Sequence, residues 1–228
     1  MSSTAYEDLY REIFPFWQEL SREEQELFCR NTVARTVYKG ENIHGGQGEC
    51  TGVIIVRKGS LRTYLLSEEG REITLYRLFP GEFCMLSASC VLKTIEFDVM
   101  VDAEEDGECY IVNGKVFSEL TENNLRIQNF ALETAVERFS DVMWVMQQIL
   151  FMSYDRRLAI FLWDEMVKTN STRIYLTHEQ IARYTGSARE VVTRMLKYFA
   201  AEQMVSLFRG GIEILDKKKL KILSNPGQ

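Results

Sequence analysis

The sequence predicts an α+β protein in three successive parts: an N-terminal antiparallel β-barrel, a long helix and a C-terminal winged helix-turn-helix. Three observations carry this prediction. Short apolar runs separated by turn residues fill the first half of the chain, and a sustained apolar repeat of threes and fours follows them. Near the C-terminus, two short helical segments precede a hairpin signal. We expect the three parts to span residues 1–121, 122–151 and 152–228.

Length and composition are those of an ordinary globular protein. The 228 residues suffice for one large or two ordinary domains, and 46% are hydrophobic and 26% charged. No apolar run approaches the roughly 18 residues of a membrane span, and the polar, acidic start shows no signal peptide, so we expect a cytoplasmic protein. Five cysteines, an odd number, do not indicate a secreted disulfide framework.

Charge is divided unevenly along the chain. The net charge is −6, yet residues 151–228 hold 13 Lys+Arg against 8 Asp+Glu, whereas residues 1–150 hold 14 against 25. This is a balance of +5 in the last part and −11 in the remainder. Such asymmetry is typical of a basic nucleic-acid-binding module joined to an acidic sensory or interaction domain.

The first part begins with helices and continues with strands. Residues 6–31 have a helical pattern, in which Ser21 and Glu24 form a capping box before the second helix. From Thr32 to Asn113 the pattern changes to short β-rich runs, which predict an antiparallel sandwich or barrel. The turns between these runs include Lys58-Gly59, Glu69-Gly70 and Pro80-Gly81.

A long helix is expected from about Glu122 to Phe151. Its apolar residues step by alternating threes and fours, which is typical of a helix that pairs with another in a coiled coil. A lone amphipathic helix packed on the barrel would carry a similar stripe, but we favour a two-fold dimer. The predicted dimer seam consists of Leu132, Ala135, Phe139, Val142, Met146 and Ile149.

Two short helices with a tight turn are predicted next. Thr177 followed by Gln180 is a capping box that begins the first helix, and Gly186 can adopt the left-handed conformation that ends it. Ser187 is expected to cap the second helix, with Glu190 at the partner position of another capping box.

The second helix has two faces. One face is apolar and should point into a core: Val192, Met195, Leu196 and Phe199. The other carries long donors, one carboxylate and a hydroxyl: Arg189, Glu190, Thr193, Arg194 and Lys197. This combination suits the reading of base edges in a DNA major groove, although a solvated helix surface is the simpler alternative. The hairpin signal around Arg209-Gly210-Gly211 favours a winged helix and therefore DNA.

The chain resembles the CRP/FNR family of bacterial transcription regulators over nearly its full length. The resemblance rests on VRKGSLRTY and REITLYRLFPGEF in the first part, DRRLAIFL after the long helix, and GSAREVVTR in the second short helix. It implies a homodimer with a cupin-like, jelly-roll barrel that binds a small effector. It also implies that the dimer binds a palindromic operator in double-stranded DNA and contacts RNA polymerase.

The resemblance also assigns DNA contacts. Arg189, Glu190 and Arg194 match the base-contacting positions of the family, and Thr193 matches a fourth, variable position. A TTGAT- or TGTGA-like half-site is expected. Ser187 and the amides around it suit a phosphate, and Lys197 completes the predicted DNA-binding set.

The residues that would identify a familiar effector are missing. Cyclic-nucleotide-binding members hold phosphate through Pro-Gly-Glu and a later arginine-containing segment. Here residues 80–82 keep Pro-Gly-Glu, but residues 95–99 contain Glu96 and Asp98 and no arginine, so cyclic AMP is not expected.

The N-terminal part, with Cys29 and Cys50, has too few thiols for an iron–sulfur cluster of the FNR type. His44 and His178 alone do not indicate haem, so the cofactor stays unknown.

The segment after the Pro-Gly turn is the predicted effector pocket. Its residues are Gly81, Glu82, Phe83, Cys84, Ser87, Ser89 and Cys90. Cys84 and Cys90 could form a redox-responsive pair or leave space for a compact ligand. They could equally be two buried thiols that act as small apolar residues, which is the commoner role of free cysteine.

Two other classes of function are alternatives. A cupin-like barrel can host metal-dependent catalysis, but two histidines are too few for the ligand set, so we do not expect an enzyme. A non-DNA interaction module, whose barrel binds another protein, is the second alternative.

Overall fold

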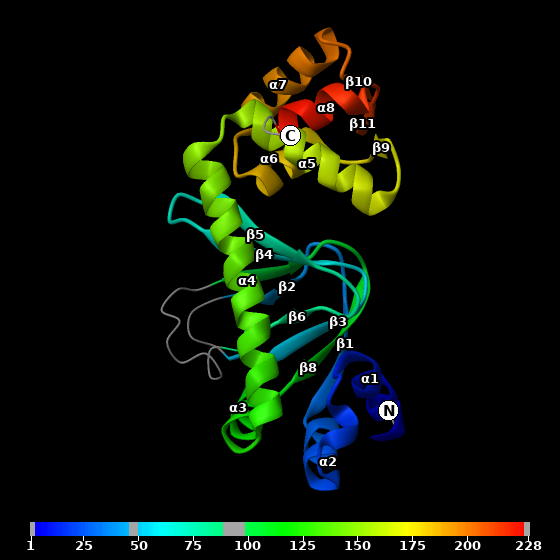
Figure 1. The fold of residues 1–228 in the computed structure, drawn as a ribbon, viewed down its shortest axis with the longest axis vertical. Coiled ribbons are helices and arrows are strands. Elements are labelled where there is room, and N and C mark those ends of the chain that lie inside the picture. Colours follow the sequence, from blue (N-terminus) through cyan, green and yellow to red (C-terminus); the bar gives the residue numbers. More distant parts are fainter. Residues whose placement is uncertain (1–2, 46–49, 89–98, 226–228) are drawn as a thin grey trace. The chain divides into compact units, whose positions relative to one another are not determined.

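The computed structural model describes residues 3–45, 50–88 and 99–225 (Figure 1). The chain forms two compact units, each of which is described by itself. The N-terminal unit comprises residues 1–66 and 75–142, and the C-terminal unit comprises residues 67–74 and 143–228. The division falls within the long helix, and the expected boundaries at 121/122 and 151/152 stay predictions.

The N-terminal unit begins with helices stabilised by an aromatic core. Tyr10, Phe14, Trp17 and Phe28 are buried and contact one another with ring centroids 4.8–6.3 Å apart. The predicted capping box is confirmed, since Glu24 N–H donates to Ser21 Oγ at 3.2 Å and Ser21 N–H donates to Glu24 Oε2 at 2.7 Å. The elements are α1 (Ser3–Ile13), the short helix η1 (Trp17–Glu19) and α2 (Arg22–Arg30).

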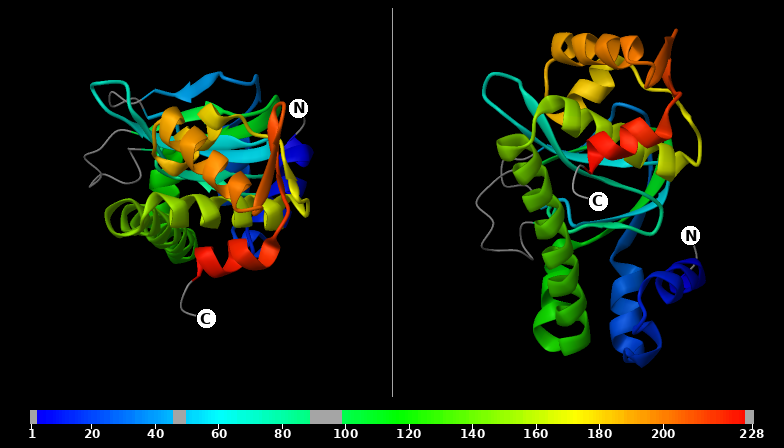
Figure 2. Two further views of the ribbon diagram at one scale, coloured as in Figure 1. Left: turned by 90° about the horizontal axis from the view of Figure 1, so that it is seen from above. Right: turned by 45° about the horizontal axis from the view of Figure 1, so that its top comes forward.

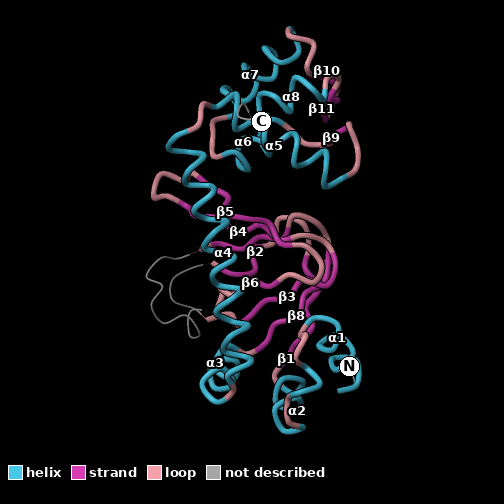
Figure 3. The backbone as a smooth tube through the Cα atoms, viewed as in Figure 1, coloured by secondary structure: helices cyan, strands magenta, loops and turns pink. Residues whose placement is uncertain are grey.

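Two four-stranded antiparallel sheets follow (Figure 3). The described strands do not close into the single barrel that was expected but form a jelly-roll-like pair of sheets, with orders β1-β8-β3-β6 and β2-β7-β4-β5. A fold of this kind needs only two facing sheets that share a core. The strands are β1 (Thr32–Val37), β2 (Asn42–His44), β3 (Val53–Lys58), β4 (Leu61–Leu66), β5 (Glu72–Leu78), β6 (Phe83–Cys84), β7 (Met100–Ala103) and β8 (Gly107–Val112).

Strand β3 contributes to two cores. Its first four residues are all buried, which is why the sequence shows a continuous apolar run rather than an alternating one. Val53 and Ile55 belong to the core that includes the N-terminal aromatic residues, whereas Ile54 and Val56 belong to the core between the sheets. Successive side chains of a strand point to opposite faces, so a strand covered on both faces must be apolar at every position.

The long helix begins later than expected. The structure has α3 (Gly114–Asn123) and α4 (Leu125–Phe151) in place of one helix from Glu122. Asn124 leaves the helical conformation, with φ −132° and ψ 113°. Its Nδ2 donates to Glu24 Oε1 at 2.7 Å, and its Oδ1 accepts from Arg126 N–H at 2.9 Å. These side-chain bonds stabilise the break and begin α4.

The C-terminal unit is a small helical module, coloured from yellow-green to red in Figure 2. It has one three-stranded sheet of order β10-β11-β9. Helix α4 ends at Phe151, and Ser153 is extended before the next helix. The elements are α5 (Tyr154–Thr169), β9 (Arg173–Ile174), α6 (His178–Thr185), α7 (Arg189–Ala201), β10 (Val205–Phe208), β11 (Gly211–Ile214) and α8 (Lys217–Ser224). None of the described helices is long and apolar enough to cross a membrane.

Candidate nucleic-acid interface

Helix α6 begins and ends where local signals predict. Gln180 N–H donates to Thr177 Oγ1 at 3.2 Å, and Thr177 N–H donates to Gln180 Oε1 at 2.9 Å, which confirms the capping box. Gly186 is left-handed, with φ 59° and ψ 44°, as predicted. Helix α5 supports this end, because Arg157 Nη1 donates to the Thr185 carbonyl at 2.9 Å. The turn between α6 and α7 is therefore stabilised by its own left-handed glycine and by a hydrogen bond from α5.

The predicted cap of α7 is wrong. Ala188 rather than Ser187 is the N-cap residue, and it makes no side-chain bond. Ser187 instead completes the end of α6, since its N–H donates to the Ala182 carbonyl at 2.9 Å. Glu190 still lies in the first turn of α7, where the helix dipole favours a carboxylate.

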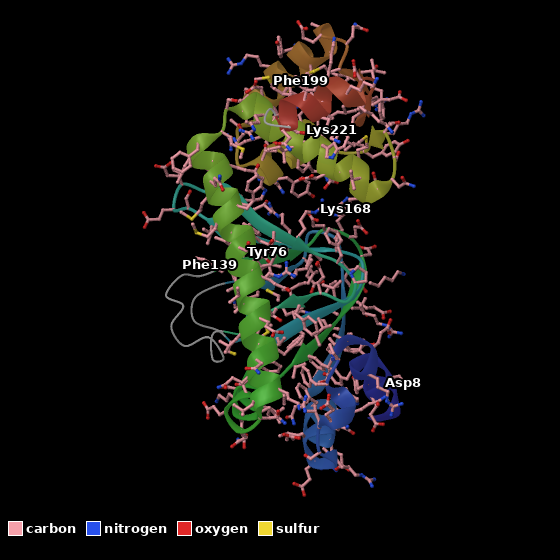
Figure 4. All side chains as sticks on the ribbon, viewed as in Figure 1. Asp8, Tyr76, Phe139, Lys168, Phe199 and Lys221 are labelled. Atoms are coloured by element: carbon pink, nitrogen blue, oxygen red, sulfur yellow. The ribbon has the colours of Figure 1, made fainter. Side chains whose placement is uncertain are left out.

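The apolar face of α7 fixes the direction of the other face. Val192, Leu196 and Phe199 are fully buried and pack with Ile181 of α6 and Ile212 of β11 (Figure 4 labels Phe199). Residues three and four apart share one side of a helix, so the polar residues between them must point outward. The tertiary core of the unit thus presents the polar face to solvent.

The predicted reading residues come together on this outer face. Arg189, Glu190, Arg194 and Lys197 are exposed, and Thr193 is half-buried. These five side chains line one shallow hollow in the surface. Ser187, the sixth predicted residue, does not line it. The hollow combines cationic donors with one carboxylate and one hydroxyl, which is the chemistry needed to bind phosphates and base edges.

His178 is a neighbour of this face that sequence reasoning did not include. Its Nδ1 lies 2.9 Å from Thr193 Oγ1, and Thr193 Oγ1 donates to the Arg189 carbonyl at 2.9 Å. Partial burial, and then the positive charges of Arg189 and Lys197, lower the pKa of His178 below its ordinary value. Only the crossing of α6 over α7 brings residues 178 and 193 together, so no local pattern signals the contact.

The wing is present and carries an aromatic pair. Strands β10 and β11 are joined by Arg209-Gly210, and Gly210 has a φ of 87°. The rings of Tyr175 and Phe208 contact edge to face at 5.7 Å. A Cβ on Gly211 would lie 2.4 Å from Phe208 Cζ and 2.6 Å from the Ile174 carbonyl oxygen. The Phe208 ring can therefore occupy this place only because residue 211 is glycine.

The basic C-terminal segment forms α8, capped by Asp216, whose side chain accepts from Lys218 and Lys219 N–H. Two of its lysines are engaged within the unit. Lys219 Nζ donates to the Glu202 carbonyl at 3.1 Å, and Lys221 Nζ lies 5.8 Å from the Trp163 ring centroid.

The apolar stripe of α4 differs from the predicted seam. Leu132, Phe139 and Met146 are exposed, by 65% for Phe139, which Figure 4 labels. The other three predicted residues, Ala135, Val142 and Ile149, are only partly exposed, and Val142 packs against the core between the sheets. The residue that follows each of these three, which is Val136, Met143 or Leu150, is exposed instead. The exposed stripe therefore consists of Leu132, Val136, Phe139, Met143, Met146 and Leu150.

The described members of the predicted effector pocket have different surroundings. Gly81 is in a turn, and Glu82 Oε2 accepts from Phe79 N–H at 2.8 Å. Phe83 belongs to the aromatic core, whereas Cys84 belongs to the core between the sheets. Ser87 is buried and its Oγ lies 2.7 Å from the Gly52 carbonyl oxygen. Ser89 and Cys90 lie outside the described residues, as do Glu96 and Asp98.

Cys84 instead takes part in a buried polar cluster. Its thiol is free, and Sγ lies 3.9 Å from Thr63 Oγ1 and 4.0 Å from the Tyr76 hydroxyl. Arg138 of α4 lies over the Tyr76 ring at 5.0 Å and pairs with Glu82 at 3.6 Å. Burial raises the pKa of Tyr76 well above its ordinary value, so the phenol is neutral.

This cluster combines residues from β4, β5, β6 and α4 that are distant in the sequence. The Arg138 side chain is only 13% exposed, and its Nε has no hydrogen-bond partner among the described residues. The buried hydroxyls, thiol and guanidinium of the cluster have chemistry suited to a small polar ligand. Among the residues that the structure describes, no three His, Cys, Asp or Glu side chains are arranged to hold a metal ion.

Two family models match the chain. The model of the Crp-like helix-turn-helix domain matches residues 156–223, and that of the cyclic nucleotide-binding domain matches residues 34–124. The first contains the whole hollow of α7 and the wing. The second covers both sheets from the third residue of β1 onward and the polar cluster except Arg138.

Comparisons over most of the chain give relatives and structures of transcription regulators. A crystal structure of a transcriptional regulator of the CRP/FNR family from Eubacterium rectale is 44% identical, with a TM-score of 0.88, and covers 93% of this chain and 99% of its own. The transcriptional activator protein Anr of Pseudomonas aeruginosa is 26% identical over 199 residues, covering 83% of this chain and 80% of its own. FixK2 from Bradyrhizobium japonicum, at 16% identity and a TM-score of 0.69 over 84% of this chain and 96% of its own, is similar in fold.

Proposed function

Because the chain belongs to the CRP/FNR family of transcription regulators, we propose that it binds a palindromic operator as a homodimer under the control of a small effector. The hollow on α7 is the observation that carries this proposal. Five side chains suited to phosphates and base edges line it, and a core packed on the opposite side of the helix holds them outward.

Within the hollow, the residues have different tasks. Arg194 and Arg189 can each bind a guanine through two parallel hydrogen bonds, and Glu190 can accept from a cytosine amino group. Each such base contact contributes about 1–3 kcal/mol of discrimination. Lys197, with a single charged amine, suits a phosphate and adds affinity without sequence preference. A TTGAT- or TGTGA-like half-site remains the expected target.

The exposed stripe of α4 supports a homodimer. Six apolar side chains follow one another at alternating steps of four and three residues along a 27-residue helix. Pairing with the same stripe of a second copy would remove this surface from water, as in a two-stranded coiled coil. A two-fold dimer would also present two copies of α7 to half-sites one helical turn of DNA apart, about 34 Å.

The effector is proposed to bind at the polar cluster of Thr63, Tyr76, Cys84 and Arg138. Arg138 pairs with Glu82 and Asp141, but its buried Nε has no hydrogen-bond partner among the described residues, which favours a small ligand with an accepting group. Cyclic AMP is not part of the proposal, because the sequence of residues 95–99 contains Glu96 and Asp98 and no arginine that could bind a phosphate. Effector binding beside α4 would change the pairing of the two long helices and thereby the DNA affinity.

The remaining parts of the proposal concern the protein partner, the cellular location and the division into domains. Relatives at 25% and 26% identity are named transcriptional activators, which supports a contact with RNA polymerase. A protein that acts on chromosomal DNA in bacteria works in the cytoplasm. The expected division into a sensing part, a dimerisation helix and a DNA-binding part at residues 121/122 and 151/152 belongs to the same proposal.

Selection of binding sites from random DNA with the pure full-length protein tests this function. The expected result is one palindromic site, bound with an affinity that falls steeply with salt. Arg194→Ala should relax the preference at one position of the half-site, whereas Lys197→Ala should weaken all sequences about equally and reduce the salt slope by about 1. Absence of any sequence preference, or equal behaviour of the two variants, would contradict the assignment.

A further inference from the structure

His178 joins a titratable ring to the proposed reading face. Its Nδ1 lies 2.9 Å from Thr193 Oγ1, and Thr193 lines the hollow on α7. The chain has only two histidines. The other, His44, is buried in the N-terminal unit, where Nδ1 lies 2.8 Å from Thr51 Oγ1. Any histidine titration linked to DNA therefore has one candidate beside the interface.

The hydrogen bonds determine which ring nitrogen carries the proton. A threonine hydroxyl has one hydrogen, and that of Thr193 is donated to the Arg189 carbonyl at 2.9 Å. Thr193 Oγ1 must therefore accept from His178, so Nδ1 is the protonated nitrogen of the neutral ring. Nε2 is left to take up a proton, and no residue that the structure describes bonds to it.

The charges around the ring are unfavourable to its protonation in the free protein. From α7, Arg189 and Lys197 face His178, and on α6 its neighbour Glu179 is exposed. Burial and these two cations lower the pKa of His178, so the ring is neutral near neutral pH. A DNA phosphate at this surface has the opposite effect, because a nearby negative charge raises the pKa of an imidazole.

We propose that His178 contacts a DNA backbone phosphate as an imidazolium, so that operator binding takes up one proton per protomer. The proton comes from solvent and adds to Nε2. Nε2–H then donates to a phosphate oxygen, while Nδ1–H keeps its bond to Thr193. The proposal rests on the proposed DNA-binding function and adds a regulation to it: operator affinity depends on pH.

The direction of this dependence follows from linkage. The protonated ring is the form that binds, so affinity is highest at low pH and falls as pH rises through the pKa of the bound state. Between the pKa values of the free and bound states, affinity should fall by roughly tenfold per pH unit for each proton taken up. Below both values the dependence disappears.

Fluorescence anisotropy with the selected operator, measured between about pH 6 and pH 8 at fixed salt, tests the proposal. Calorimetry in two buffers with different ionisation enthalpies counts the protons taken up. His178→Gln retains a neutral hydrogen-bond donor but does not titrate, so it should show a flat pH profile and no His-linked uptake. His178→Arg, which is always charged, should be flat as well but bind tightly throughout. His44→Gln is the matched control and should keep the wild-type slope.

Two outcomes would overturn the proposal. One is a wild-type pH slope that persists in His178→Gln, and the other is equal proton uptake by the wild type and this variant. Thermal melts of each variant establish that it is folded. Failure of the His178 proposal would leave operator preference intact, whereas loss of operator preference at every pH would refute the DNA-binding function itself.

Discussion

Phe139→Ala tests which side of α4 pairs with a second copy. Phe139 is 65% exposed in the protomer. A phenylalanine has about 200 Å² of surface, so roughly 130 Å² is free for a partner to cover. At about 25 cal/mol per Å² this area corresponds to about 3 kcal/mol per protomer. An alanine side chain would still bury part of this area, so the loss per protomer is smaller than about 3 kcal/mol. A two-fold dimer contains the substitution twice, so the losses of both protomers add. We expect a loss of about 4 kcal/mol of dimerisation free energy, or nearly a thousandfold in Kd.

Sedimentation equilibrium over a range of protein concentrations measures this constant. Val142→Ala is the matched control, because Val142 belongs to the seam predicted from sequence but packs against the core of its own chain. It should lower the thermal stability of the N-terminal unit and leave the dimer constant within about threefold. An unchanged dimer in Phe139→Ala, or a greater loss of dimer in Val142→Ala, would refute the assignment of the exposed stripe as the seam.

Two further predictions concern the stability of the C-terminal unit. Thr177→Ala removes the capping box of α6 and should lower the free energy of unfolding by about 1 kcal/mol, as measured by urea titration, whereas Thr177→Ser should restore most of it. Phe199→Ala creates a cavity in the core of the unit and should cost about 3–5 kcal/mol, seen as an earlier thermal transition of this unit and loss of operator binding. An unshifted transition in Phe199→Ala would contradict the described core.

Local signals made much of the fold predictable. The capping boxes at Ser21 and Thr177 and the left-handed Gly186 depend on residues within a few positions of one another, so the sequence contains their full cause. The polar face of α7 is equally readable, since helical spacing places its members together in any fold. Ser187 shows the limit of such reasoning, because its N–H closes α6 and a neighbouring alanine becomes the cap of α7.

The exposed stripe of α4 shows what helical spacing alone does not determine. Leu132, Phe139 and Met146 repeat every seven residues, and an apolar partner stands both three and four positions after each of them. A heptad accepts either step, so the sequence leaves two possible stripes. In the structure, Val142 of the first stripe packs against the core of its own chain, whereas the residues of the second stripe are exposed.

By itself, the sequence determined the order of the elements, the helix ends that rest on local hydrogen bonds, the polar face of α7 and the family resemblance. Tertiary structure decided which stripe of α4 is exposed, that Cys84 lies with Thr63, Tyr76 and Arg138, and that His178 bonds to Thr193. The physical reason is the same in each case. These contacts join residues distant along the chain, and only the packing of whole elements brings them within reach of one another.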